Sequence, residues 1–291
     1  PIRSSAIVRT RWQTYLRDHG LTPELLGAKT WDDVSPVGRA DAGAGQGRLS
    51  AAASLPLRRL FYWSMRFTHW DSVRYVGSVV AANEQLVSGG SDAAASPQNL
   101  NLYTNFNNWG GRMYVPGNPL AASSDPNYAQ MSYDWFEFAR MRGAGMLWTE
   151  DWFPDRMANR WSYFAARMRS ATVLAAPFNG SSEFSGYIVP RSGGQQAGGL
   201  LRRAIALVGG GAKALRYFQF GPEYTSPSNC YSESSDLNGL FREMRLAHAM
   251  IASAESTLWE ARRPRSQTAI LMPRSSGFWD DWEVAHPTGV C

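Results

Sequence analysis

Two sequence patterns alternate repeatedly between residues 100 and 221. Short apolar runs break off into polar and aromatic residues, and a stretch with helical spacing separates each run from the next. This alternation is typical of a parallel sheet whose strands are connected by helices. We therefore predict strands over residues 100–106, 146–149, 184–189 and 214–220.

Apolar residues spaced three and four apart predict helices around these strands. Thr22 and Pro23 predict the start of a short helix, with Gly27 as its stop. A further strand is predicted after Pro264, over residues 267–272, where a second domain would begin. The longer predicted helices cover residues 7–18, 57–86, 127–142, 154–169, 196–208 and 237–263.

Two adjacent carboxylates, Glu150 and Asp151, follow the second predicted strand and lie between Trp148 and Trp152. Catalytic groups in parallel α/β folds lie just beyond the carboxyl ends of the strands. An indole wall can raise the proton affinity of one carboxylate while the other stays ionised, as acid–base catalysis requires. The pair is therefore the candidate catalytic site, with both tryptophans as substrate-binding residues. The structural alternative is that Asp151 starts the loop and Glu150 pairs with an arginine such as Arg191.

Three further residues near strand ends are candidate substrate-binding groups: Asn105, Trp109 and Glu223. The amide of Asn105 can both donate and accept hydrogen bonds, and Trp109 offers an indole face on which a sugar ring can stack. Glu223 follows the fourth predicted strand and could accept a hydrogen bond from a sugar hydroxyl. It equally fits an exposed turn, because its neighbours are Gly221 and Pro222.

Composition narrows the classes of partner. The chain has 12 Trp, 12 Tyr and 13 Phe, and sugar-binding clefts are rich in such rings, although helix–sheet packing also accounts for many of them. The net charge of +5 comes from arginines scattered singly or in pairs, and only Lys29 and Lys213 are lysines. A nucleic-acid surface would show clustered basic residues, so no nucleic-acid partner is predicted.

No metal or organic cofactor is predicted. Cys230 and Cys291 have no metal-ligand spacing, and they either pair in an oxidising compartment or remain separate thiols. The glycine-rich stretches match no nucleotide-binding loop. No run is long and apolar enough to predict membrane insertion. Asn179, Gly180 and Ser181 form a glycosylation sequon, which favours an extracellular or secreted protein.

Several motifs resemble segments of glycoside hydrolase family 42, the β-galactosidase-like family. The opening RTRWQTYLRDHGLTPELLGAKTWDDVSP is similar to the helix and loop after that family's fourth strand. Thr104-Asn105-Phe106 resembles the end of its fifth strand, and LWTEDWFP at residues 147–154 resembles the end of its sixth. AKALRYFQF at residues 212–220 is similar to its eighth strand, and residues 267–282 resemble the start of the small domain that follows.

This resemblance implies an α/β fold of the (β/α)8 TIM-barrel type, with the strand 5–8 half present in this chain. Residues 1–263 would form the partial barrel and residues 264–291 the start of a following small domain. We expect the chain to be an excerpt of a longer polypeptide. Family members cleave a terminal sugar with paired glutamates. One glutamate would lie before Pro1, and the other would end the third predicted strand, where Val189 and Pro190 stand.

Three explanations of the missing glutamate stay open. In the first, the predicted register is wrong and Glu183 or another acid is the nucleophile. In the second, Glu150 has taken that role. In the third, the barrel is an inactive pseudoenzyme. An inactive barrel would act as a carbohydrate-binding or structural module of a larger extracellular assembly. The leading expectation is a β-galactosidase-like glycosidase with a carbohydrate partner, as a homo-oligomer or with other chains that complete the barrel. An open α/β domain with small-molecule chemistry is the expectation if the chain is complete.

Overall fold

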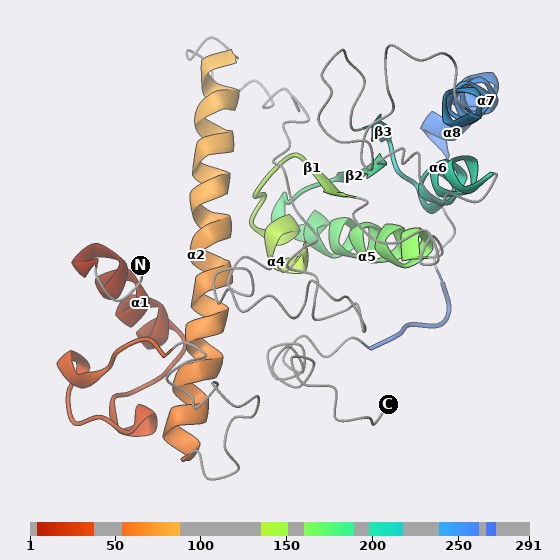
Figure 1. Ribbon diagram of the computed structural model, residues 1–291. Helices are drawn as coiled ribbons and strands as arrows, with labels where there is room; N and C mark the ends of the chain where they lie inside the picture. The colour runs from red at the N-terminus through yellow and green to blue at the C-terminus, as the bar shows by residue number, and fades with distance from the viewer. Residues whose placement is uncertain are drawn as a thin grey trace. The chain divides into compact units, whose positions relative to one another are not determined.

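The computed structural model describes residues 5–37, 54–87, 135–150, 160–188, 198–217, 239–261 and 266–271 (Figure 1). It divides into two compact units, and the boundary falls within one long helix, between Ser72 and Val73. Of the described residues, those up to Ser72, together with Ile270 and Leu271, form the N-terminal unit, and the others, from Val73 to Ala269, form the sheet unit.

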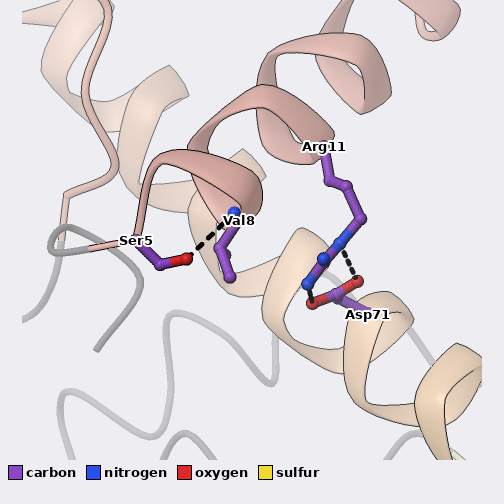
Figure 2. A network of polar contacts seen from close by, with 4 residues as sticks. All are labelled: Ser5, Val8, Arg11 and Asp71. Atoms are coloured by element: carbon purple, nitrogen blue, oxygen red, sulfur yellow. Dashed lines mark hydrogen bonds and ion pairs between the residues drawn. The ribbon is translucent and has the colours of Figure 1, made fainter.

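The N-terminal unit begins with helix α1 (Ala6–Asp18), which confirms the helix predicted at residues 7–18. The hydroxyl of Ser5 accepts a hydrogen bond from the Val8 amide at 3.4 Å (Figure 2). Such a bond satisfies one of the amides that a helix start leaves without a partner. The apolar side of α1 packs into the core of this unit, where Trp12 and Leu16 are fully buried.

Helix α2 (Leu55–Val87) is 33 residues long and confirms the helix predicted at residues 57–86. Its N-terminal part carries Phe67 into the same core as Trp12. Beside that core, the Arg11 guanidinium donates to both carboxylate oxygens of Asp71, at 3.0 and 2.8 Å (Figure 2). The hydrogen bonds that Arg11 donates to the Asp71 carboxylate raise the pKa of Arg11. This pair therefore connects α1 to the N-terminal part of α2.

Replacing Asp71 by asparagine is expected to lower the free energy of unfolding of the N-terminal unit by about 0.5–1 kcal/mol, because solvent screens a partly exposed pair. Urea denaturation checks this value, and the loss should shrink at high salt. Asp18→Asn on α1 is the matched control, since it removes a carboxylate and leaves the pair intact. An Asp71→Asn loss no larger than the control would contradict a stabilising pair.

Two 3-10 turns follow α1, namely η1 (Glu24–Leu26) and η2 (Trp31–Asp33). Gly27 ends η1 with a φ of 76°, a left-handed conformation that glycine adopts without strain. The predicted short helix with its Gly27 stop is therefore confirmed as a 3-10 turn. At η2, the amide and hydroxyl of Thr30 donate to the Asp33 carboxylate at 3.1 and 2.9 Å. This local bonding fixes the start of the turn.

The sheet unit contains three parallel strands in the order β1-β2-β3. They are β1 (Met146–Glu150), β2 (Glu183–Ile188) and β3 (Ala214–Tyr217). The strands predicted at residues 146–149, 184–189 and 214–220 are confirmed at these positions. The strand predicted at residues 100–106 lies outside the described residues.

Helices α5 (Arg160–Ala175) and α6 (Gly199–Gly210) follow β1 and β2 and pack against the sheet (Figure 1). The described parts of the helices predicted at residues 154–169 and 196–208 are confirmed, and each helix ends later than predicted. Leu207 of α6 is fully buried, and it packs over Gly186 at the centre of β2. A Cβ at Gly186 would lie 2.2 Å from a Leu207 methyl, so the missing side chain lets α6 approach the sheet.

Helix α4 (Trp135–Arg140) precedes β1, and residues 127–134 of its predicted range lie outside the described residues. After β3, the single helix predicted at residues 237–263 is wrong. The structure has two helices there, α7 (Gly239–Ser253) and α8 (Glu255–Glu260). Ala254 interrupts them with φ −117° and ψ 8°, outside the helical region.

The prediction of a (β/α)8 TIM-barrel type fold, with its strand 5–8 half in this chain, is wrong. The described residues are mostly helical and contain one sheet of three parallel strands. A local alternation of strand and helix indicates parallel pairing, whereas barrel closure depends on strand number and stagger across the whole sheet. The same alternation is compatible with a small sheet covered by helices, which is what the described residues form.

The strand predicted at residues 267–272 is also wrong in its described part, because residues 266–271 form no strand. The Ser266 hydroxyl accepts from the Thr268 amide at 3.2 Å and donates to the Thr268 carbonyl at 2.7 Å. Such local side-chain bonds compete with extended pairing. The predicted domain boundary after residue 263 stays a prediction.

Candidate functional site

The carboxyl ends of β1, β2 and β3 lie along one edge of the sheet, the carboxyl edge. Glu150, the last residue of β1, pairs with Tyr187 of β2. Ile188, the last residue of β2, pairs with Tyr217, the last residue of β3. Ligands of parallel α/β folds bind beyond this edge, because the connections that follow the strands start there. The carboxyl edge is therefore the candidate site, with Glu150 as the acidic residue that the structure places there.

Trp148 and Tyr187 pack together near this edge. Trp148 is 4% exposed, and its ring centroid lies 4.9 Å from that of Tyr187, with the rings edge to face. A pair of this geometry contributes about 0.5–1.5 kcal/mol beyond the area that it buries. Ser185, which pairs with Trp148 across the strands, is fully buried, and its hydroxyl has no hydrogen-bond partner among the described residues. Trp148 thus helps to hold β1 against β2, and its predicted contact with a substrate stays a prediction.

Tyr217 brings a buried hydroxyl to the end of β3. This hydroxyl has no hydrogen-bond partner within the described part of the chain. Burial raises the pKa of Tyr217 to about 12, and the positive charge of Arg203 offsets only part of that shift. The ring of His248 lies 5.3 Å from the Tyr217 ring. The phenol is therefore neutral near pH 7, so it can donate a hydrogen bond but is a poor general base.

A side chain from α7 holds the start of α6. The Glu243 carboxylate accepts hydrogen bonds from the amides of Gly198, Leu200 and Leu201 at 2.6, 3.1 and 3.5 Å. Gly198 has no side chain with which to cap the helix, so these amides need an acceptor from elsewhere. Sequence reasoning missed Glu243. The available signal was a glycine at the helix start in place of Ser, Thr, Asp or Asn.

A cavity of about 170 Å³ lies at the amino end of β3, with walls from α6, α7 and α8. Lys213 lines it and donates hydrogen bonds to the carbonyls of Leu258 and Trp259 at 3.1 and 2.6 Å. The Lys213 ammonium also lies 5.4 Å from the centre of the Trp259 ring. Its positive charge therefore stabilises the C-terminal end of α8. The cavity lies at the other end of β3 from the carboxyl edge.

Glu183, one alternative for the missing glutamate, is the first residue of β2 and pairs with Met146. From Met146 to Glu150 the strand advances about 13 Å, at a rise of about 3.3 Å per residue. Paired carboxylates in glycosidases are separated by no more than about 10 Å. The register thus places Glu183 near the amino edge of the sheet, and it does not favour Glu183 as a partner of Glu150.

For the other candidate site residues, the proposed roles stay predictions. For Glu150, the structure gives the backbone position at the end of β1. The remaining ones lie outside the described residues; they are Asn105, Trp109, Asp151, Trp152 and Glu223.

Within the described residues, no group of three or more His, Cys, Asp or Glu side chains is arranged to hold a metal ion. Among the helices that the structure describes, none combines the length and the apolar character needed to cross a membrane.

No known protein matches this chain in three comparisons. A scan against protein-family models finds no match, and searches of the curated proteins and of the solved structures find none either. The resemblance to glycoside hydrolase family 42 therefore rests on the motifs of the sequence alone.

Proposed function

We propose that the carboxyl edge of the sheet binds a carbohydrate and that Glu150 takes part in the hydrolysis of its terminal glycosidic bond. The observation that carries this proposal is the position of Glu150. It is the last residue of β1 and pairs with Tyr187, so an acidic residue stands where parallel strands end together. The motif resemblance and the abundance of aromatic residues support a sugar as the substrate.

Hydrolysis of a glycosidic bond needs two carboxyl groups. One protonates the leaving oxygen, and the other either attacks the anomeric carbon or activates a water molecule. Asp151 follows Glu150 directly and is the proposed second group. Such a pair needs one carboxyl group that is protonated and one that stays ionised, and an apolar wall can separate their proton affinities in this way. Glu150 is proposed as the proton donor and Asp151 as the ionised partner.

A second candidate function is carbohydrate binding without turnover. The end of β2 supports it. That strand ends at Ile188, and Val189 and Pro190 follow, where the resemblance implies a glutamate. Neither side chain can act as a nucleophile or a base. A site that lacks this carboxylate could keep its affinity for a sugar and lose the chemistry.

The full chain, assayed with galactosides whose leaving group is an alcohol, such as lactose, tests both functions, because an alkoxide leaving group needs the proton that Glu150 is proposed to supply. Glu150→Gln keeps the size of the side chain and removes its proton donor, so kcat should fall by about 10²–10⁴-fold. Glu260→Gln on α8, away from the carboxyl edge, is the matched control and should keep wild-type activity. Saccharide binding without turnover in the wild-type chain would establish the second candidate. Wild-type protein that neither binds nor cleaves saccharides would contradict both.

A further inference from the structure

The cavity at the amino end of β3 is lined mostly by apolar side chains, among them Val208 of α6, Ile251 of α7 and Leu258 of α8. Its volume of about 170 Å³ is close to that of an engineered protein cavity of about 150 Å³ that binds benzene. His248 and Trp259 also line the cavity and are exposed, so it is open to solvent. A compact apolar group can therefore enter this cavity and be buried there.

Lys213 brings a positive charge to the cavity. Its ammonium has three N–H donors, and two of them bond to the carbonyls of Leu258 and Trp259 at 3.1 and 2.6 Å. Among the described residues, no carboxylate pairs with this ammonium. The two carbonyl bonds hold the ammonium in place, and one N–H and the full positive charge are left for an anionic group of a ligand.

Glu255 brings a negative charge to the same cavity. It is the first residue of α8, and the carbonyls that hold Lys213 belong to residues three and four positions further along that helix. The points that anchor the two charges are therefore about one turn, or about 5.4 Å, apart along the helix axis. Within the described part of the chain, nothing pairs with the Glu255 carboxylate. The cavity thus presents one charge of each sign beside an apolar interior.

We propose that this cavity binds a free amino acid with an apolar side chain of about the size of leucine. The α-carboxylate pairs with Lys213, the α-ammonium pairs with Glu255, and the side chain enters the apolar part beside Val208 and Ile251. Both charged groups of an amino acid are attached to one carbon atom. A hydrogen bond of about 2.8 Å on each side lets them bridge protein groups anchored one helical turn apart. A simple anion or a simple cation would match only one of the two charges.

This site lies at the other end of β3 from the carboxyl edge, so the inference does not depend on the proposed carbohydrate function. Leucine and two analogues, titrated separately into the full chain, test it. 4-Methylpentanoate lacks the α-ammonium, 3-methylbutylamine lacks the α-carboxylate, and both keep the apolar group. Each analogue should bind about tenfold more weakly than leucine, because each loses one charged hydrogen bond. The methyl resonances of Ile251 and Leu258 should shift during the leucine titration.

Variants assign the two charges. Lys213→Met should weaken the binding of leucine and 4-methylpentanoate by about tenfold and leave that of 3-methylbutylamine unchanged. Glu255→Gln should weaken the binding of leucine and 3-methylbutylamine by a similar factor and leave 4-methylpentanoate no weaker. Arg202→Met on α6 is the matched control, because Arg202 is an exposed cation that does not line the cavity. Val208→Trp fills the cavity, keeps both charges and should abolish the binding of all three compounds.

A wild-type chain that does not bind leucine, or leucine binding that persists in Val208→Trp, would overturn the site. Equal wild-type affinities for leucine and 4-methylpentanoate, or unchanged leucine affinity in Glu255→Gln, would overturn its assignment to an amino acid. An equal loss in Lys213→Met and Arg202→Met would overturn the role of Lys213. Since Lys213 also holds the end of α8, Lys213→Arg, which keeps the charge and the donors, should retain leucine binding, and its loss there would overturn that role too.

Discussion

Replacing Trp12 by alanine is expected to lower the free energy of unfolding of the N-terminal unit by about 3–5 kcal/mol. Trp12 is fully buried in a core with Tyr15, Leu16 and Phe67. Truncation removes the largest side chain of this core and leaves a cavity that the surrounding rings cannot close. Hydrogen exchange of α1 as a function of urea measures the loss in this unit directly.

Two further variants separate packing from other effects. Ile7→Ala on the same helix should change stability by no more than about 0.5 kcal/mol, because Ile7 is 72% exposed. Trp12→Phe should lose much less than Trp12→Ala. It keeps an aromatic ring and removes the indole N–H, which is buried with no hydrogen-bond partner among the described residues. Equal losses for Trp12→Ala and Ile7→Ala would contradict the placement of Trp12 at the centre of this core.

Replacing Gly186 by valine is expected to lower the free energy of unfolding of the sheet unit by about 3 kcal/mol, through overpacking. A Cβ at Gly186 would lie 2.2, 2.8 and 3.0 Å from three side-chain atoms of Leu207. Leu207 is fully buried, so it cannot turn away into solvent. Either α6 moves away from β2 or Leu207 adopts a strained rotamer. Thermal and urea denaturation of the full chain measure the loss.

The matched control is Gly209→Ala in α6. No atom lies within 4 Å of a Cβ built there, so this variant should be neutral or stabilising, by up to about 1 kcal/mol from helix propensity. In the double variant Gly186→Val with Leu207→Ala, the smaller side chain makes room for the larger one. The double variant should therefore lose less than the sum of the two single losses. A strictly additive loss would contradict the packing of Leu207 over Gly186.

The parts of the fold that the sequence predicts well are those set by neighbouring residues. The spacing of Val8, Trp12 and Leu16 predicts the helix at residues 7–18, because residues four apart share one face of a helix. The apolar run at residues 146–149 and its two successors predict three strands, since each run is short and flanked by turn formers or helical patterns. These predictions needed no knowledge of distant parts of the chain.

The predictions that failed depend on contacts between distant residues. The number of strands in a sheet and its closure are set across the whole fold, so the alternation that begins at residue 100 could not distinguish a barrel from a small sheet. Residues 267–272 are apolar enough for a strand, but Ser266 and Thr268 bond to each other instead. Pattern alone also could not place the break at Ala254 between α7 and α8.

In the candidate site too, features set by neighbouring residues were predicted and features set by distant contacts were not. Glu150 was predicted correctly as the end of a strand, because the apolar run at 146–149 stops there. The buried state of Trp148 depends on packing against Tyr187, which lies far along the chain. Glu243 could not be predicted as a helix cap for α6, since the amides that donate to it are 42 to 45 residues away in the sequence. Contacts between residues far apart in the sequence could not be predicted from local patterns, whereas the ends of strands could.

Backbone NMR of the isotopically labelled chain tests whether a carbohydrate binds at the carboxyl edge of the sheet, as we propose. During titration with a galactose-containing saccharide, the amides of Glu150, Ile188 and Tyr217 should shift the most. The amides at the other ends of the same strands, Met146, Glu183 and Ala214, should shift little. Saturating shifts confined to the amino ends, or no shifts at any concentration of saccharide, would contradict carbohydrate binding at the carboxyl edge.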